Sequence, residues 1–175
     1  MTPLGAAVVV LCIAAATIGG AWAFQAAGYA PCELCLEERF AYYAGIPLAA
    51  LVALAAARGA PRLLVAAGLV LIALIFAANA VLGAYHAGIE WGFWPGPAEC
   101  TGSTKPATSF EEFQRQLKGL TVVRCDAAAI RIAGLSLAGW NALVSLGLAI
   151  VAAAGVARQP VRPGRVLYGS RMESQ

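Results

Sequence analysis

Two cysteines and an arginine occupy one short stretch of the chain. Cys32 and Cys35 form a Cys-x-x-Cys pair, and Arg39 follows closely. If a helix begins near Pro31, where the missing N–H of proline costs nothing, the three residues lie on one helical face. The positive end of a helix and a guanidinium group both stabilise a thiolate, which is the attacking species in thiol–disulfide exchange. This stretch therefore predicts redox chemistry.

The other cysteines leave alternatives open. Cys100 and Cys125 share one polar segment, whereas Cys12 lies in an apolar stretch, where we expect a packing role. Four thiols in an oxidising compartment naturally make two disulfides. A zinc site is disfavoured because only Cys32 and Cys35 have short ligand spacing. Purely structural disulfides remain an alternative, although a bridge over three residues restricts the unfolded chain little.

The charged residues near the pair also have interpretations that involve no catalysis. Arg39 could reach lipid headgroups or pair with Glu38. Glu37 and Glu38 are expected to be solvated or to lie at headgroup level.

The amino-acid composition indicates that the chain lies in a membrane. Of 175 residues, 61% are hydrophobic and 12% are charged, and the mean hydropathy is +0.75. These values predict a membrane protein. The net charge of +3 is small, and no basic patch is interleaved with aromatic residues, so nucleic-acid binding is not expected.

Four apolar stretches are long enough to span a bilayer. We expect an all-α membrane protein in which four transmembrane helices form a bundle, at about 4–24, 40–57, 63–85 and 132–157. The apolar part of the second helix is 40–57, and its start is expected near Pro31, with Pro47 as a kink. A cleaved signal peptide ending near Ala23 is disfavoured, because residues 1–10 lack a positive region and the apolar stretch is too long.

The polar segments suggest an orientation. Residues 86–131 are expected to form one long extramembrane loop on the side opposite the cytoplasm, in which residues 109–120 have the pattern of a short amphipathic helix. Residues 1–157 would then form the transmembrane domain, and 158–175 a basic cytoplasmic tail. The charge bias that places both termini in the cytoplasm comes from Arg58, Arg62, Arg158, Arg162, Arg165 and Arg171. An aromatic belt on the opposite leaflet is predicted from Trp22, Trp91, Trp94 and Trp140.

The stretch from Pro31 to Arg39 resembles the Pro-Cys-x-Leu-Cys-x-x-Glu-Arg signature of the DsbB family. These are bacterial inner-membrane proteins that reoxidise the periplasmic thiol oxidase DsbA. The similarity extends along nearly the whole chain, through Tyr85-His86, Cys125-Asp126 and the run that ends at Trp140. The resemblance implies a protein-disulfide:quinone oxidoreductase in the inner membrane, with both cysteine pairs on the periplasmic side.

By this resemblance, the catalytic residues are Cys32, Cys35, Cys100 and Cys125, and no metal takes part. A reduced DsbA-like carrier would attack the loop disulfide at Cys100 and free Cys125. Cys125 or its partner would then pass electrons to the Cys32–Cys35 bond, and from there they would reach the membrane quinone pool.

The resemblance also implies which residues bind the quinone. Cys35, Arg39 and His86 match family residues near the bound ubiquinone or menaquinone, although a lone histidine at a helix end is more often interfacial. Gln25 and Asn79 are expected to make hydrogen bonds between helices, with contacts near the quinone as the alternative. Two alternatives remain at this point: a non-catalytic scaffold braced by disulfides, and a quinone reductase of the vitamin K epoxide reductase type. In the latter, the Cys-x-x-Cys pair generally lies in the last helix.

Overall fold

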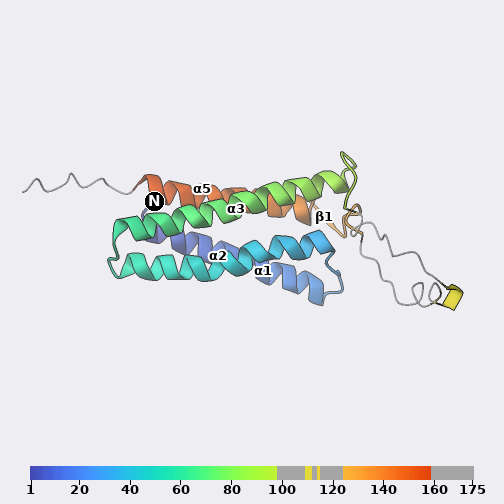
Figure 1. Cartoon of the computed structure of the whole chain (residues 1–175), viewed down its shortest axis with the longest axis horizontal. Helices are drawn as coiled ribbons and strands as arrows, with labels where there is room; N and C mark the ends of the chain where they lie inside the picture. The colour runs from blue at the N-terminus through green and yellow to red at the C-terminus, as the bar shows by residue number, and fades with distance from the viewer. Residues whose placement is uncertain (98–108, 112–113, 115–123, 159–175) are drawn as a thin grey trace, which may run out of the picture.

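The computed structural model describes residues 1–97, 109–111, 114 and 124–158. The four long helices among these residues run side by side (Figure 1). They are α1 (Pro3–Ala26), α2 (Glu33–Ala57), α3 (Arg62–Glu90) and α5 (Leu137–Ala157), with two short strands, β1 (Arg131–Ile132) and β2 (Leu135–Ser136), before α5. Each helix is long and apolar enough to cross a membrane. The prediction of four such helices is therefore confirmed.

The start of α2 lies where the sequence predicted it, near Pro31. The helix begins at Glu33, after Pro31 and well before residue 40, and it continues through Pro47 without interruption. Cys32 is the N-cap: its backbone is extended, and its sulfur accepts a hydrogen bond from the Cys35 N–H. A sulfur atom thus replaces the oxygen that usually caps a helix. This cap places Cys32 at the helix entrance and Cys35 in the first turn.

The last helix starts later than expected, at Leu137 and not at Ile132. Residues 131–136 form a small antiparallel hairpin in which Arg131 pairs with Ser136. Its turn requires positive φ at Ala133 (51°) and Gly134 (84°), which a helix cannot contain. Ser136 then caps α5 through a hydrogen bond from the Gly139 N–H.

The third helix is longer than expected, since it ends at Glu90 and not at residue 85. The additional residues include His86 and Ile89, both of which are buried. Tertiary packing thus keeps His86 in the helix, although the sequence pattern predicts that a loop begins at this residue.

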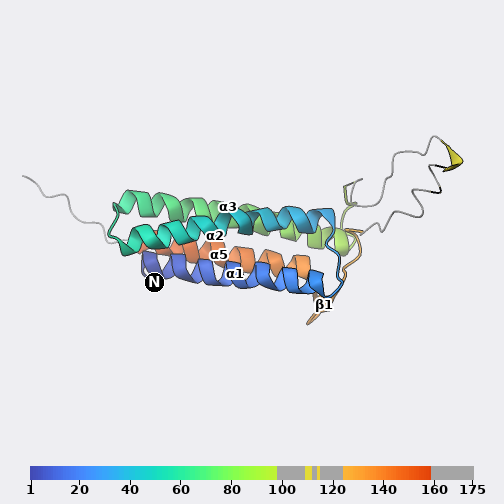
Figure 2. The same ribbon diagram turned by 90° about the horizontal axis from the view of Figure 1, so that it is seen from below.

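The helices form an antiparallel ring in which α1 packs on α2, α2 on α3, α3 on α5 and α5 on α1. Figure 2 shows the same arrangement from below. The interior holds a few large side chains, including Leu69, Ile72 and Phe76, among many buried alanines. Gly45 of α2 faces the Phe76 ring of α3 and leaves no room for a side chain. Small residues therefore allow close helix contact.

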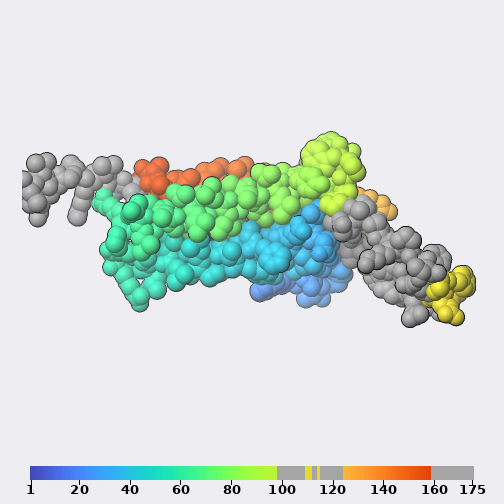
Figure 3. Space-filling view, in the orientation of Figure 1, coloured from blue at the N-terminus to red at the C-terminus, as the bar shows by residue number. Residues whose placement is uncertain are grey.

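The two ends of the bundle carry different chemistry. The N-terminus, the 58–61 connector and the end of α5 lie at one end, which carries Arg58, Arg62 and Arg158 (Figure 1). The start of α2, the end of α3 and the 124–136 segment lie at the other end. There residues 91–97, which follow α3, form a projection on the surface (Figure 3). All four tryptophans are exposed at this second end.

Three sequence predictions fall largely or wholly outside the described residues. They concern Cys100, the amphipathic helix of residues 109–120, and the tail beyond Arg158.

Candidate active site

Cys32 and Cys35 are free thiols at the start of α2, and their sulfurs lie 2.8 Å apart. Cys32 is buried and Cys35 is half-buried. The hydrogen bond from the Cys35 thiol lowers the pKa of Cys32, which precedes the membrane-spanning helix, and this effect exceeds the opposing effect of burial. The pair is therefore arranged to interconvert between a dithiol and a disulfide, with Cys32 as the more readily ionised thiol.

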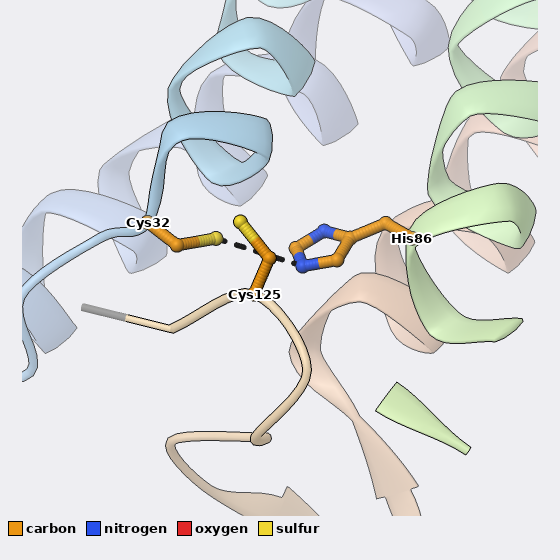
Figure 4. A group of neighbouring side chains, drawn as sticks. All are labelled: Cys32, His86 and Cys125. Carbon is orange, nitrogen blue, oxygen red and sulfur yellow. Dashed lines mark hydrogen bonds between the residues drawn. The ribbon is translucent and has the colours of Figure 1, made fainter. Parts of the chain in front are cut away.

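Cys125 lies directly against this pair. It is 1% exposed and disulfide-bonded, and the sulfurs of Cys32 and Cys125 and a ring nitrogen of His86 lie within 4.8 Å of one another. Figure 4 shows the three side chains converging from the start of α2, the end of α3 and the segment before β1. The predicted partner of Cys125, Cys100, lies outside the described residues. The fold thus brings a cysteine of the long loop to the Cys-x-x-Cys pair.

This cluster does not form a metal-ligand set in the state observed. Zinc binds cysteine as a thiolate, whereas the Cys125 sulfur is already in a disulfide. Cys32 and His86 alone are too few ligands for a structural zinc site.

His86 lies between the pair and an acidic residue. Its Nε2 is 3.5 Å from Cys32 Sγ, and its Nδ1 is 2.8 Å from Glu38 Oε1. His86 is 1% exposed and Glu38 is 6% exposed, so the expectation that Glu38 is solvated is wrong. A neutral histidine that donates Nδ1–H to the Glu38 carboxylate leaves Nε2 as an acceptor facing the Cys32 thiol.

Asn141 of α5 connects Glu38 to the rest of the bundle. Its amide nitrogen donates to Glu38 Oε2 at 2.9 Å, and its oxygen accepts from the Tyr42 hydroxyl at 2.6 Å. Asn79 of α3 donates to both Asn141 and Ser145. These bonds satisfy the polar groups inside an apolar bundle and fix the Glu38 carboxylate in position.

A cavity of about 370 Å³ opens between α1, α2 and α5 on the other side of Cys35. Its wall is mainly apolar, and its polar and ionisable lining includes Cys35, Glu38, Arg39, Tyr42 and Asn141. Small-molecule sites have this size and this combination of an apolar wall with a few converging polar groups. A quinone ring, which is flat and apolar with two acceptor oxygens, fits that chemistry.

Arg39 lines the cavity and is held by α1. Its Nη1 donates to Gln25 Oε1 at 2.7 Å, whereas both carboxylate oxygens of Glu38 bond elsewhere. The alternative in which Arg39 pairs with Glu38 is therefore wrong. Gln25 makes the interhelical bond that the sequence suggested, and it does so at the cavity.

The structure divides the predicted site residues into two groups. Cys35 and Arg39 lie at the cavity, whereas Cys32, His86 and Cys125 meet on the other side of the pair. His86 is not among the residues that line the cavity. The sequence analysis missed Glu38, Tyr42 and Asn141. A usable signal was present, because Glu38 and Tyr42 follow Cys35 at helical spacing and Asn141 interrupts an apolar helix.

Comparison with known proteins identifies the family. A family model described as "Disulfide bond formation protein DsbB" matches residues 4–155. The chain belongs to the DsbB family. Members act in disulfide-bond formation, in general through quinone-linked reoxidation of DsbA. This DsbB-family protein is accordingly a multi-pass membrane oxidoreductase that acts on disulfides.

One similar protein has a name that states no function. An uncharacterized protein of Rickettsia prowazekii (strain Madrid E) is 29% identical over 126 residues, which cover 70% of this chain and 69% of that protein. No solved structure matches the chain.

Proposed function

We propose that this protein oxidises the dithiol of a DsbA-like periplasmic carrier and transfers the electrons through two cysteine pairs to membrane quinone. The supporting observation is the position of Cys125, whose sulfur lies within 4.8 Å of the Cys32 sulfur in a buried site. A loop cysteine held there can exchange with the helix pair without a large rearrangement. The cavity beside Cys35 provides a place for the electron acceptor.

The relay runs in steps that conserve bonds and electrons. The carrier thiolate attacks Cys100 of the Cys100–Cys125 disulfide, which forms a mixed disulfide and releases Cys125 as a thiolate. Cys125 then attacks Cys32 of the Cys32–Cys35 disulfide and releases Cys35 at the cavity. The second thiolate of the carrier then attacks its mixed disulfide with Cys100, which releases the oxidised carrier and the Cys100 thiolate. Cys100 attacks Cys125 of the Cys125–Cys32 bond, which restores the Cys100–Cys125 disulfide and leaves Cys32 and Cys35 as a dithiol. This dithiol gives two electrons and two protons to a quinone bound at the cavity, which would leave as quinol, and the Cys32–Cys35 disulfide is restored.

Arg39 is proposed to hold the acceptor. Its guanidinium lies at the cavity, fixed by Gln25, and a positive charge there favours an acceptor oxygen that gains negative charge. The rings of ubiquinone and menaquinone would meet the same side chains. The cysteine end would face the periplasm, and both termini the cytoplasm, in a bacterial inner membrane.

The test uses purified protein in lipid nanodiscs with a reduced DsbA-like carrier and a soluble ubiquinone analogue. Carrier oxidation and quinol formation should both stop in Cys32→Ser and Cys35→Ser, and Cys12→Ser should behave as wild type. Arg39→Ala should slow quinol formation more than carrier exchange. Carrier oxidation that survives the loss of Cys32 or Cys35 would instead favour the scaffold alternative.

A second experiment addresses the carrier-facing step. Cys125→Ser should trap a mixed disulfide between Cys100 and the carrier in native membranes, and Cys100→Ser should prevent it. Mass spectrometry of the trapped complex identifies both the partner and the cysteine that holds it.

A further inference from the structure

The two thiols of the helix pair have different routes to the cavity. Formation of the Cys32–Cys35 disulfide releases two electrons and two protons. Cys35 lines the cavity, so its proton can leave there directly. Cys32 is 5% exposed and is not part of the cavity wall, so its proton needs a carrier.

Hydrogen bonds supply a continuous path for that proton. Cys32 Sγ contacts His86 Nε2 at 3.5 Å, His86 Nδ1 contacts Glu38 Oε1 at 2.8 Å, and Glu38 lines the cavity. Cys32, His86 and Glu38 are thus hydrogen-bonded in the same order as the nucleophile, the base and the orienting carboxylate of a catalytic triad. Here, however, the carboxylate has access to a second site on the far side of the pair.

We propose that His86 and Glu38 conduct the Cys32 proton to the acceptor cavity, with Glu38 as the proton donor to the bound acceptor. The Cys32 S–H bond breaks as His86 Nε2 takes the proton, and Nδ1 passes its own proton to Glu38. Glu38 then releases one proton into the cavity as the disulfide forms. Together with the Cys35 proton, this supplies the two protons that accompany two electrons to a quinone.

The acidic neighbours of His86 stabilise the imidazole ring as it takes up the Cys32 proton, and Glu38 is the neighbour that accepts the proton from Nδ1. Glu38 and Cys35 face it from α2, Cys32 from the entrance of α2, and Glu90 from α3, while Cys125 is in a disulfide. Asn141 holds Glu38 Oε2 without offering an acidic proton of its own. The carboxylate therefore keeps its orientation through a transfer.

This inference rests on the proposed function, and the test separates the two. Glu38→Gln keeps the shape and the hydrogen-bonding capacity of the side chain but cannot carry the proton. In single-turnover experiments, quinol formation should fall by about 100-fold, the scale of lost acid–base catalysis. Exchange between the carrier and the loop pair should stay within about two-fold of wild type. Glu37→Gln, at an exposed neighbouring position, is the matched control and should leave both rates unchanged.

Further variants distinguish chemistry from structure. His86→Gln should show the same selective loss, and Glu38→Asp, which keeps a carboxyl group, should recover part of the rate. If wild type forms quinol and Glu38→Gln forms it equally fast, the Cys32 proton leaves through Cys35 and the proposal is overturned. If wild type forms no quinol, it is the proposed function that fails.

An independent readout needs no quinone. Reduction of the Cys32–Cys35 disulfide by dithiothreitol, followed by infrared difference spectroscopy, should change a carboxyl C=O band. The band should vanish in Glu38→Gln and persist in Glu37→Gln and Glu90→Gln. A spectrum in which Glu38→Gln retains the band would contradict the assignment of the proton path.

Discussion

At the residue scale, the two thiols of the Cys-x-x-Cys pair differ because their neighbours differ. Cys32 caps the helix, is buried beside His86 and Cys125, and accepts a hydrogen bond from the Cys35 N–H. Cys35 stands one turn further along and faces the cavity. One thiol thus lies beside Cys125 and the other lies at the cavity.

A pH profile tests the contribution of Cys35 to the Cys32 thiolate. The Cys35 hydrogen bond lowers the pKa of Cys32, so its removal in Cys35→Ala should raise that pKa. The midpoint of Cys32 alkylation should move up by about one pH unit, the scale of one hydrogen bond to a charged group. Alkylation at neutral pH should slow accordingly.

The measurement is the iodoacetamide rate against pH, followed by mass spectrometry in a Cys12→Ala background. Cys35→Ser is the control, because its hydroxyl can still donate to the Cys32 sulfur, and it should shift the profile less. Identical profiles for the two variants would show that the hydrogen bond does not set the Cys32 pKa.

At the element scale, the distance between α2 and α3 decides whether Glu38 reaches His86. A close contact sets this distance: a Cβ on Gly45 would lie 2.7 Å from two atoms of the Phe76 ring. Tyr42, one turn from Gly45, also packs its ring edge-on against Phe76 at 5.5 Å. The glycine is therefore a packing requirement and not a source of flexibility.

Gly45→Ala should destabilise the bundle. The added methyl group must displace the buried Phe76 ring, and overpacking of this kind costs about 1–3 kcal/mol. Denaturant titration in mixed micelles would measure the change in unfolding free energy.

Gly147→Ala is the matched control, because nothing lies within 4 Å of a Cβ at this exposed helical position. It should be neutral or slightly stabilising. Equal destabilisation by both substitutions would mean that the contact with Phe76 is not the cause.

At the scale of the whole molecule, the two ends of the bundle differ in charge. Among the described residues, the end opposite the cysteine pair carries arginines and no acidic side chain, whereas the cysteine end carries Arg39, Arg124 and Arg131 together with acidic residues. Arg58, Arg62 and Arg158 lie at one end, and the cysteine pair, Cys125 and the exposed tryptophans at the other. Basic residues that flank membrane helices favour the cytoplasmic side. This arrangement supports a periplasmic position for the cysteines.

Reporter fusions test that orientation. Alkaline phosphatase, which needs an oxidising compartment, should be active when fused after Pro97 and inactive when fused after Gly59 or Arg158. Fluorescent protein fusions at the same positions should give the opposite pattern. Activity after Gly59 with none after Pro97 would invert the proposed topology.

Patterns of consecutive residues in the sequence were sufficient to predict a membrane protein, its four helices and the Cys-x-x-Cys pair at the start of the second helix. Apolar length is a property of consecutive residues, and so is the signature from Pro31 to Arg39, which led to the family that the comparison confirmed. The roles of Cys35 and Arg39 at an acceptor site also followed from the family resemblance, and they stay predictions.

Only the tertiary structure decided what surrounds the pair. His86 and Glu38 are 48 positions apart, and Asn141 is 103 positions from Glu38, so no local pattern could join them. Glu38 reads as a solvated charge because burial of a carboxylate requires partners, and those partners come from α3 and α5. The same folding brings Cys125 to Cys32, and no spacing within the helix-start motif could indicate that contact.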